Sequence, residues 1–300
     1  MKMTGDVSVY AFDKAGNRSD PFDGTYDLTI TEAVDADHAW YGSLADFSAP
    51  AQPTEIADAA TGTVRLQLSN VSWLRGPDLD DPDNDPPGDP TIDPSIPSGH
   101  ATAWKFSGVN SQATATGSST TTAATLDGTH SLTLMAWVKP DADSSGTRVI
   151  MSQATATTGG TSLFSLQEND TNRWQMCVQL ATQVCATSSS VASADGSWTL
   201  VVGQWSSATA AGAKSLRVAS YRYDTTGARV LSGGIDAPPE LSPGTAPTAS
   251  SGPLVLGRDQ SAAQHRWKGA MTDPIVFNSY LDSNQIGAIW GARPGFSEAN

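Results

Sequence analysis

Acidic side chains on strands could support hydrolysis, because a glycoside hydrolase needs two carboxylates about 5–10 Å apart across the bond it cleaves. Acids are sparse in the strand-like segments of this sequence, and Glu168 and Asp170 fall in a predicted turn at 167–172. The sequence has no Gly-x-Ser-x-Gly motif, no phosphate-binding loop and no His plausibly paired with a Ser or Cys nucleophile. The sequence therefore does not indicate catalysis.

Cation binding by an acidic loop is a second candidate chemistry. Asp81, Asp83 and Asp85 have the spacing that opens an EF-hand calcium loop. However, the sixth position is Pro86, where such a loop needs Gly, and the twelfth is Ile92, where it needs Glu. A solvated acidic linker is therefore favoured here.

Aromatic rings could stack on a sugar while neighbouring polar side chains bind its hydroxyl groups. The chain has 9 Trp, 6 Tyr and 7 Phe. Trp104 and Trp137 lie in apolar strand patterns and are expected in the core. The candidate ligand-binding residues lie near predicted strand ends or loops, and they are Trp205, Tyr221, Tyr223, Arg258, Asp259, His265 and Trp267.

The two cysteines, Cys177 and Cys185, are eight residues apart. Because this separation is even, both side chains would share one face of an antiparallel hairpin that turns near Ala181. Opposed positions of that kind lie within disulfide reach, so we expect a disulfide, with two reduced buried thiols as the alternative. The four His residues are scattered and no Cys-x-x-Cys motif occurs, so a Cys/His zinc site has no support.

The charge balance excludes some classes of partner. The formal net charge is −14, with 17 Lys and Arg against 31 Asp and Glu, and the basic residues form no cluster. Binding to nucleic acid or to an anionic membrane surface is therefore not expected. No apolar run is long enough for a transmembrane helix, and the first residues lack the apolar stretch of a signal peptide. We expect a piece of a longer exported polypeptide.

Most of the chain has the pattern of short strands separated by Gly, Ser and Asp. Roughly a dozen such strands predict a two-sheet antiparallel sandwich. The predicted strands are 39–44, 63–68, 71–74, 103–106, 132–138, 148–151, 163–166, 174–180, 198–204, 216–223, 254–256 and 274–277. A short C-terminal helix is predicted over 283–290, with Asp282 as its cap. Residues 77–99, rich in Asp and Pro, are expected to form an exposed, extended loop.

The first 35 residues look like a fragment of another β domain. Residues 7–12 and 26–31 alternate like two strands around a turn at 13–17, but one hairpin cannot bury a core. The segment "DKAGNRS" resembles the last hairpin of bacterial immunoglobulin-like or fibronectin-type repeats. We interpret 1–35 as the remnant of such a repeat and 36–296 as the main domain.

Five segments in order resemble the bacterial laminin-G-like, concanavalin A-like jelly-roll family. They are "IADAATG", "LQLSNVSWLRGP", "ATAWKFSG", "HSLTLMAWVKPD" and "RWKGAMTDPIVFNSYLDSNQIGAIW". The resemblance implies an all-β jelly roll, and it implies one structural calcium ion in some members. Asp58, Asp127 and Asp273 flank strands where such an ion could bind, although "FSG" here replaces the family's "FDG".

We therefore expect a non-catalytic extracellular binding or adhesion module of a larger secreted or surface protein. Its partners would be a polysaccharide or other glycan, or an extracellular protein, together with neighbouring β domains of the same polypeptide. A structural spacer without a specific ligand is the first alternative. A divergent glycoside hydrolase of the concanavalin A-like fold is the second.

Overall fold

The computed structural model describes residues 36–41, 53–60, 64–75, 91–92, 95–96, 102–117, 130–142, 146–154, 162–192, 196–207, 215–223, 229–233, 252–260 and 265–291. The chain divides into two compact units, Met1–Ala33 and Val34–Asn300. All of the described residues belong to the second unit. The predicted remnant at 1–35 lies outside the described residues, so its origin stays a prediction.

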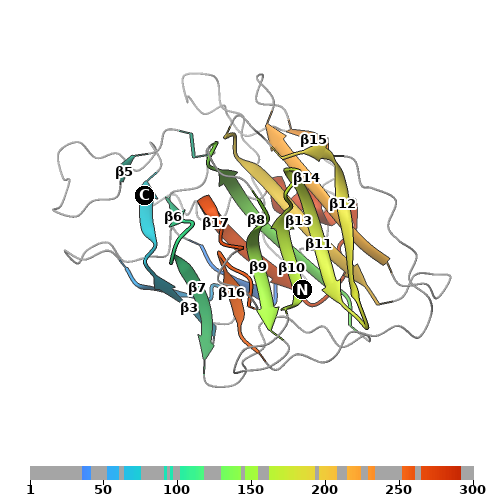
Figure 1. Cartoon of the computed structure of the whole chain (residues 1–300), viewed down its shortest axis with the longest axis horizontal. Helices are drawn as coiled ribbons and strands as arrows, with labels where there is room; N and C mark the ends of the chain where they lie inside the picture. The colour runs from blue at the N-terminus through green and yellow to red at the C-terminus, as the bar shows by residue number, and fades with distance from the viewer. Residues whose placement is uncertain are drawn as a thin grey trace, which may run out of the picture. The chain divides into compact units, whose positions relative to one another are not determined.

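One layer of the second unit is a nine-stranded sheet (Figure 1). Its strands are antiparallel except for the parallel pair β4–β5. In spatial order they are β15 (Arg229–Gly233), β14 (Ser215–Tyr223), β13 (Thr199–Ser206), β8 (Leu132–Pro140), β17 (Lys268–Phe277), β6 (Thr102–Ser107), β4 (Ser72–Arg75) and β5 (Thr91–Ile92), with β1 (His38–Ala39) also paired to β17.

The other layer is an eight-stranded antiparallel sheet. Its order is β12 (Gln183–Val191), β11 (Arg173–Gln179), β10 (Ser162–Glu168), β9 (Arg148–Ala154), β16 (Leu254–Leu256), β7 (Gln112–Gly117), β3 (Val64–Ser69) and β2 (Glu55–Ala57). The helix α1 (Ser283–Gly291) follows the last strand. The two antiparallel sheets and the short C-terminal helix confirm the predicted all-β sandwich.

The central strand β8 is buried on both of its faces. Leu134 and Ala136 point into the core between the two sheets, whereas Met135 and Trp137 belong to a second apolar cluster on the outer side of the nine-stranded sheet. Alternate residues of a strand point to opposite faces, so a continuous apolar run here reflects two covered faces.

Helix α1 contributes to the second apolar cluster through Ile286 and Ile289. Its N-terminus is capped as predicted, because Asp282 Oδ1 accepts hydrogen bonds from the amides of Asn284 at 2.8 Å and Gln285 at 2.9 Å. The Gln285 side chain in turn accepts from the Asp282 amide, which completes a capping box.

A bulge interrupts β17 between Thr272 and Ile275. Asp273 has a φ of 48° there, and Pro274 follows it. Proline has no amide hydrogen for the ladder, and within sheets it is confined to edges and bulges. The bulge therefore explains how a central strand accommodates Pro274.

The structure differs from the sequence predictions in several places. The strands β2 and β15 were not predicted. The small polar segment of β7 forms a strand that was not predicted. Within the predicted loop 77–99, Thr91–Ile92 pairs with β4 and Ile96 is buried, so part of that stretch packs on the sheet. The strand predicted over 39–44 was only partly right. The observed strand β1 ends at Ala39, Trp40 and Tyr41 are not part of a strand, and 42–44 lie outside the described residues.

Candidate functional site

The strongest polar cluster forms where β16 ends. Gly257 turns the chain with a φ of 83°, and its amide donates to Ile150 O at 2.9 Å. The Trp267 amide then donates to Gly257 O at 2.9 Å, so the two ends of the segment 257–267 lie side by side. A Cβ on residue 257 would lie 2.5 Å from the Phe106 ring, so only glycine fits this turn.

Asp259 is held by side chains from two other parts of the chain. Its Oδ1 accepts a hydrogen bond from Ser162 Oγ, and its Oδ2 lies 3.3 Å from His265 Nδ1. Ser162 Oγ also accepts from the Gln260 amide at 3.2 Å. Three predicted ligand-binding residues, Arg258, Asp259 and His265, are therefore brought together on the eight-stranded sheet.

Two members of this cluster, Ser162 and Arg266, were not predicted from the sequence. Ser162 comes from β10, distant in sequence, so no local pattern pointed to it. Arg266 lies next to the predicted His265, and its proximity to Arg258 became visible only through the pairing of Gly257 with Trp267.

Two other predicted ligand-binding residues require correction. Trp205 and Trp267 are completely buried in the core between the sheets. Trp205 points inward on the same face of β13 as Val201, and the Trp267 ring packs 6.4 Å from the Trp174 ring, centroid to centroid. A ring without exposed surface cannot stack on a ligand, so these two residues serve the core.

The two predicted tyrosines lie on the other sheet. Tyr221 of β14 is half-buried against the second apolar cluster, and burial, with a smaller contribution from Tyr280, raises its pKa. The side chain of Tyr223 lies outside the described residues. Tyr221 does not join the Asp259 cluster.

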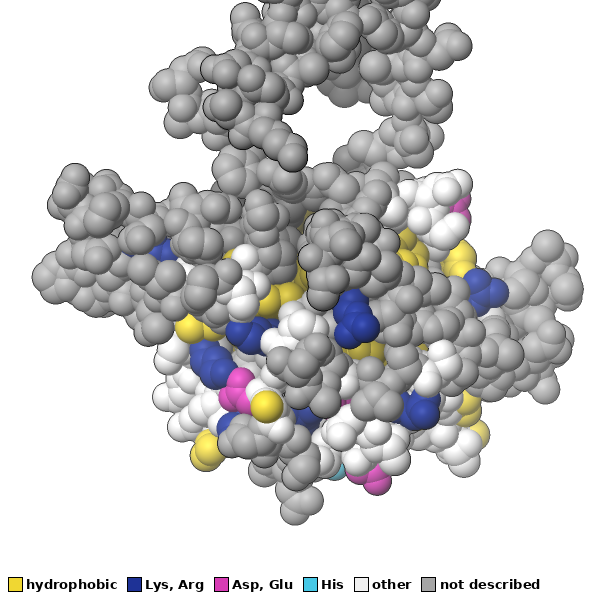
Figure 2. Space-filling view, turned by 90° about the horizontal axis from the view of Figure 1, so that it is seen from above, with side chains coloured by type: hydrophobic (Ala, Val, Ile, Leu, Met, Phe, Trp, Pro, Cys, Tyr) yellow, Lys and Arg dark blue, Asp and Glu magenta, His cyan; other side chains and the backbone are white. Residues whose placement is uncertain are grey.

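Val109 is the only large hydrophobic residue in the exposed class among the described residues, and Tyr41, Tyr221 and Tyr280 are partly exposed. On the face shown in Figure 2, Lys and Arg side chains are spread among polar and apolar ones. A ligand contacting the described residues would therefore meet mainly polar and charged groups.

Two of the three acids predicted to bind calcium flank the same N-terminal segment. Asp58 accepts hydrogen bonds from the amides of Ala39 at 3.1 Å and Ala60 at 2.9 Å, and its other oxygen lies 2.7 Å from His38 Nδ1. Together with Asp273 it raises the pKa of Tyr41, although burial is the larger cause.

No group of three or more His, Cys, Asp or Glu side chains within the described ranges could hold a metal ion, and Asp127 lies outside those ranges. The described residues do not fit a calcium site, since the Asp58 oxygens are already engaged by nitrogen groups. A structural calcium ion stays a prediction.

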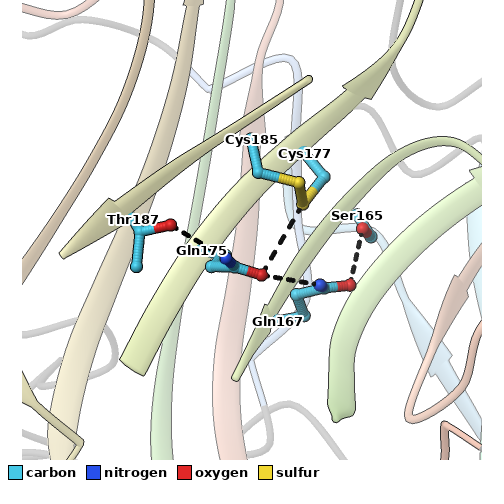
Figure 3. Close-up of a disulfide and its surroundings, with 6 residues drawn as sticks. All are labelled: Ser165, Gln167, Gln175, Cys177, Cys185 and Thr187. Atoms are coloured by element: carbon cyan, nitrogen blue, oxygen red, sulfur yellow. Dashed lines mark hydrogen bonds between the residues drawn. A yellow bond between two sulfur atoms is a disulfide. The ribbon is translucent and has the colours of Figure 1, made fainter. Parts of the chain in front are cut away.

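The predicted disulfide is confirmed. Cys177 of β11 and Cys185 of β12 are directly opposed, with Cα atoms 4.0 Å apart, and they form a disulfide (Figure 3). The hairpin turns at Leu180–Thr182, around the predicted Ala181.

Beside the disulfide, a chain of polar side chains crosses three strands (Figure 3). Ser165 Oγ donates to Gln167 Oε1 at 2.8 Å, and Gln167 Nε2 donates to Gln175 Oε1 at 3.0 Å. Gln175 Nε2 then donates to Thr187 Oγ1 at 2.8 Å. These groups satisfy one another and join β10, β11 and β12.

The comparisons with solved structures agree on the fold. The chain is similar to the binding domain of Paraclostridial Mosquitocidal Protein 1 (TM-score 0.51, 8% identity, covering 85% of this chain and 52% of that one). It is also similar to the binding domain of Botulinum Neurotoxin DC in complex with SialylT (TM-score 0.52, 8% identity, covering 86% and 52%). A third is the Botulinum Neurotoxin serotype G binding domain (TM-score 0.50, 10% identity, covering 85% and 50%). The chain thus spans about half the length of these structures, and the likeness concerns the fold alone.

No curated protein matches the sequence. No helix in the described ranges has the length and apolar character needed to cross a membrane. Residues 112–216 match the family model Laminin_G_3, described as the concanavalin A-like lectin/glucanases superfamily. By this match and by its two-sheet jelly roll, the chain is similar to the concanavalin A-like lectins and glucanases.

Proposed function

We propose that this chain is a non-catalytic carbohydrate-binding module of an extracellular protein. The observation that carries the proposal is the cluster of Arg258, Asp259, His265 and Ser162 on the eight-stranded sheet. It combines a guanidinium, a carboxylate, an imidazole and a hydroxyl, which are the donors and acceptors that fix sugar hydroxyl groups. The Asp259 side chain is 14% exposed and that of His265 is 42% exposed, so the cluster is anchored yet accessible.

The fold supports the proposal at the level of protein class. The solved structures with this fold include toxin binding domains, one of them in complex with SialylT. Fold alone does not determine function, so the residues of this chain must carry the proposed activity.

The arrangement of acids supports a non-catalytic role. Glu168 is one of the two acids that were considered for a hydrolase mechanism. It is buried at the end of β10, where it forms an ion pair with Arg148. Asp170, the other, is exposed in the turn that follows. A buried, paired carboxylate and an exposed one do not form the two facing groups that glycoside hydrolysis needs.

The disulfide supports the extracellular setting. Disulfides persist in oxidising compartments such as the cell exterior and are rare in the cytosol. Cys177 and Cys185 are both used in the disulfide, and no other Cys occurs in the chain.

A glycan array tests the proposed function. The wild-type chain, a D259N/H265A variant and an R222Q control are compared, where Arg222 is exposed on β14 of the other sheet. We expect a reproducible signal that falls at least tenfold in D259N/H265A and is unchanged in R222Q. A blank array would overturn the proposal in favour of a spacer domain. Release of reducing sugar from a bound polysaccharide would overturn the non-catalytic part.

A further inference from the structure

Two arginines lie opposite each other in the segment 257–267. The hydrogen bond between Gly257 and Trp267 is on one side of them, and the contact between Asp259 and His265 is on the other. This pairing places Arg258 directly across from Arg266. Like charges at opposed positions repel each other. The arrangement is unexpected in a chain with only 17 basic residues and a net charge of −14.

The guanidinium of Arg258 has no hydrogen-bond or ion-pair partner among the residues that the structure describes. Its Nε is buried and makes no hydrogen bond. Asp259, the neighbouring acid, directs its two oxygens to Ser162 and His265 instead. Buried polar groups are nearly always paired in folded proteins, so an orphaned donor needs an explanation.

The electrostatic environment agrees with this geometry. Burial lowers the pKa of Arg258, and the positive charge of Arg266 lowers it further, while Asp259 opposes both effects. Burial and the charge of Arg266 both disfavour the charged form of the Arg258 guanidinium. A negatively charged ligand group beside Arg258 would offset both effects.

We propose that Arg258, with Arg266 across from it, binds the carboxylate of an acidic glycan. The inference rests on the proposed carbohydrate-binding function and deepens it by naming the ligand class. A guanidinium presents parallel N–H donors that match the two oxygens of a carboxylate. Asp259, Ser162 and His265, a few ångströms apart, would then contact hydroxyl groups of the same sugar or its neighbour.

Matched pairs of glycans test the inference. Polygalacturonate is compared with its methyl ester, and sialyllactose with the methyl ester of its carboxyl group, because the members of each pair differ only in a charged carboxylate. Affinities are measured by calorimetry for the wild type, R258Q, R258K and the R222Q control. We expect the wild type to prefer the acidic member of at least one pair by tenfold or more.

The variants separate charge from geometry. R258Q should lose at least tenfold in affinity for the acidic member, and R258K should lose part of it, because an ammonium group keeps the charge without the paired donors. R222Q should bind like the wild type. R258Q should also melt at the same temperature as the unliganded wild type or higher, since it removes a repulsion, and this establishes that the variant folds.

The outcomes distinguish the two proposals. Equal binding of the acidic and neutral glycans, unchanged in R258Q, would overturn the carboxylate inference and leave the carbohydrate-binding function standing. Binding of sulfated glycans such as heparin without binding of the carboxylated ones would also overturn it. Absence of binding to any glycan would overturn both.

Discussion

Arg148 of β9 and Glu168 of β10 stand opposite each other and form an ion pair whose side chains are only 5% and 2% exposed. The Arg148 guanidinium also lies 5.6 Å from the centroid of the Trp267 ring and donates to the carbonyl of Asp141, which follows β8 of the other sheet. The pair therefore links the two sheets at one end of the sandwich.

Replacing Arg148 with Met should destabilise the protein by about 3–5 kcal/mol at pH 7, because Glu168 is left as a buried, unpaired charge. Burial already raises the pKa of Glu168, and Arg148 opposes that rise. A carboxyl group with a raised folded-state pKa contributes stability below its unfolded pKa of about 4.5, and that contribution is lost as the pH rises through the folded value.

In R148M the opposing charge is gone, so the pKa of Glu168 rises further and the loss should be larger at pH 7 than at pH 4. Urea unfolding followed by Trp fluorescence at both pH values measures this difference. R65M is the matched control, because Arg65 pairs with Glu55 at exposed positions and should cost under about 1 kcal/mol. Equal losses for R148M at the two pH values would contradict the prediction.

Replacing both Cys177 and Cys185 with Ala should lower the free energy of unfolding by about 2–3 kcal/mol, because the disulfide closes a short loop and restricts the unfolded chain. Urea titrations of the oxidised wild type and of the variant give this difference. Adding dithiothreitol should destabilise the wild type by a similar amount and leave the variant unchanged. A variant as stable as the oxidised wild type would show that the disulfide is dispensable.

Gly203 of β13 lets the two sheets approach closely. A Cβ at this position would lie 2.8 Å from Leu166 Cδ1 and 2.8 Å from Met176 Sδ, both on the opposite sheet. G203A should therefore destabilise the protein by about 1–3 kcal/mol through overpacking. G287A is the control, since a Cβ there meets nothing within 4 Å and alanine favours helix α1 by about 0.5–1 kcal/mol. Thermal melts of the two variants should shift in opposite directions.

Tyr41 should make the protein sensitive to alkaline pH. Its pKa is raised by burial first, then by Asp273 and Asp58. A group whose neutral form is favoured in the folded state contributes stability up to its unfolded pKa of 10.0, and that stability is lost as the pH rises through the folded value. The wild type should therefore lose more stability above pH 10 than Y41F does, as measured by urea unfolding.

The same tyrosine tests for calcium. A cation bound beside Asp58 and Asp273 would favour the tyrosinate and lower the pKa of Tyr41, which the absorbance of tyrosinate reports. Because both Asp58 oxygens are already engaged by His38, Ala39 and Ala60, we expect the titration and the melting temperature to be the same in calcium and in EDTA. A lowered pKa of Tyr41 together with a higher melting temperature in calcium would contradict this and would show that a cation binds at this position.

Local sequence patterns were sufficient to predict several features of the structure. The even spacing of Cys177 and Cys185 predicted a shared face of one hairpin, and Asp282 predicted the start of helix α1. Both depend on residues within ten positions of each other, where backbone geometry alone sets the neighbours. The apolar run of β8 was also predicted as a strand, because its length and composition suit a buried strand.

Only the tertiary structure decided which side chains point into the core and which residues far apart in the sequence come into contact. Alternation along a strand shows which residues share a face, but when both faces of a sheet are covered it does not show which side chains a ligand can reach. Trp205 and Trp267 were therefore predicted at the surface and lie in the core. The approach of Asp259 to Ser162 depends on how β9, β10 and β16 pair across more than ninety residues, and no local pattern encodes that pairing.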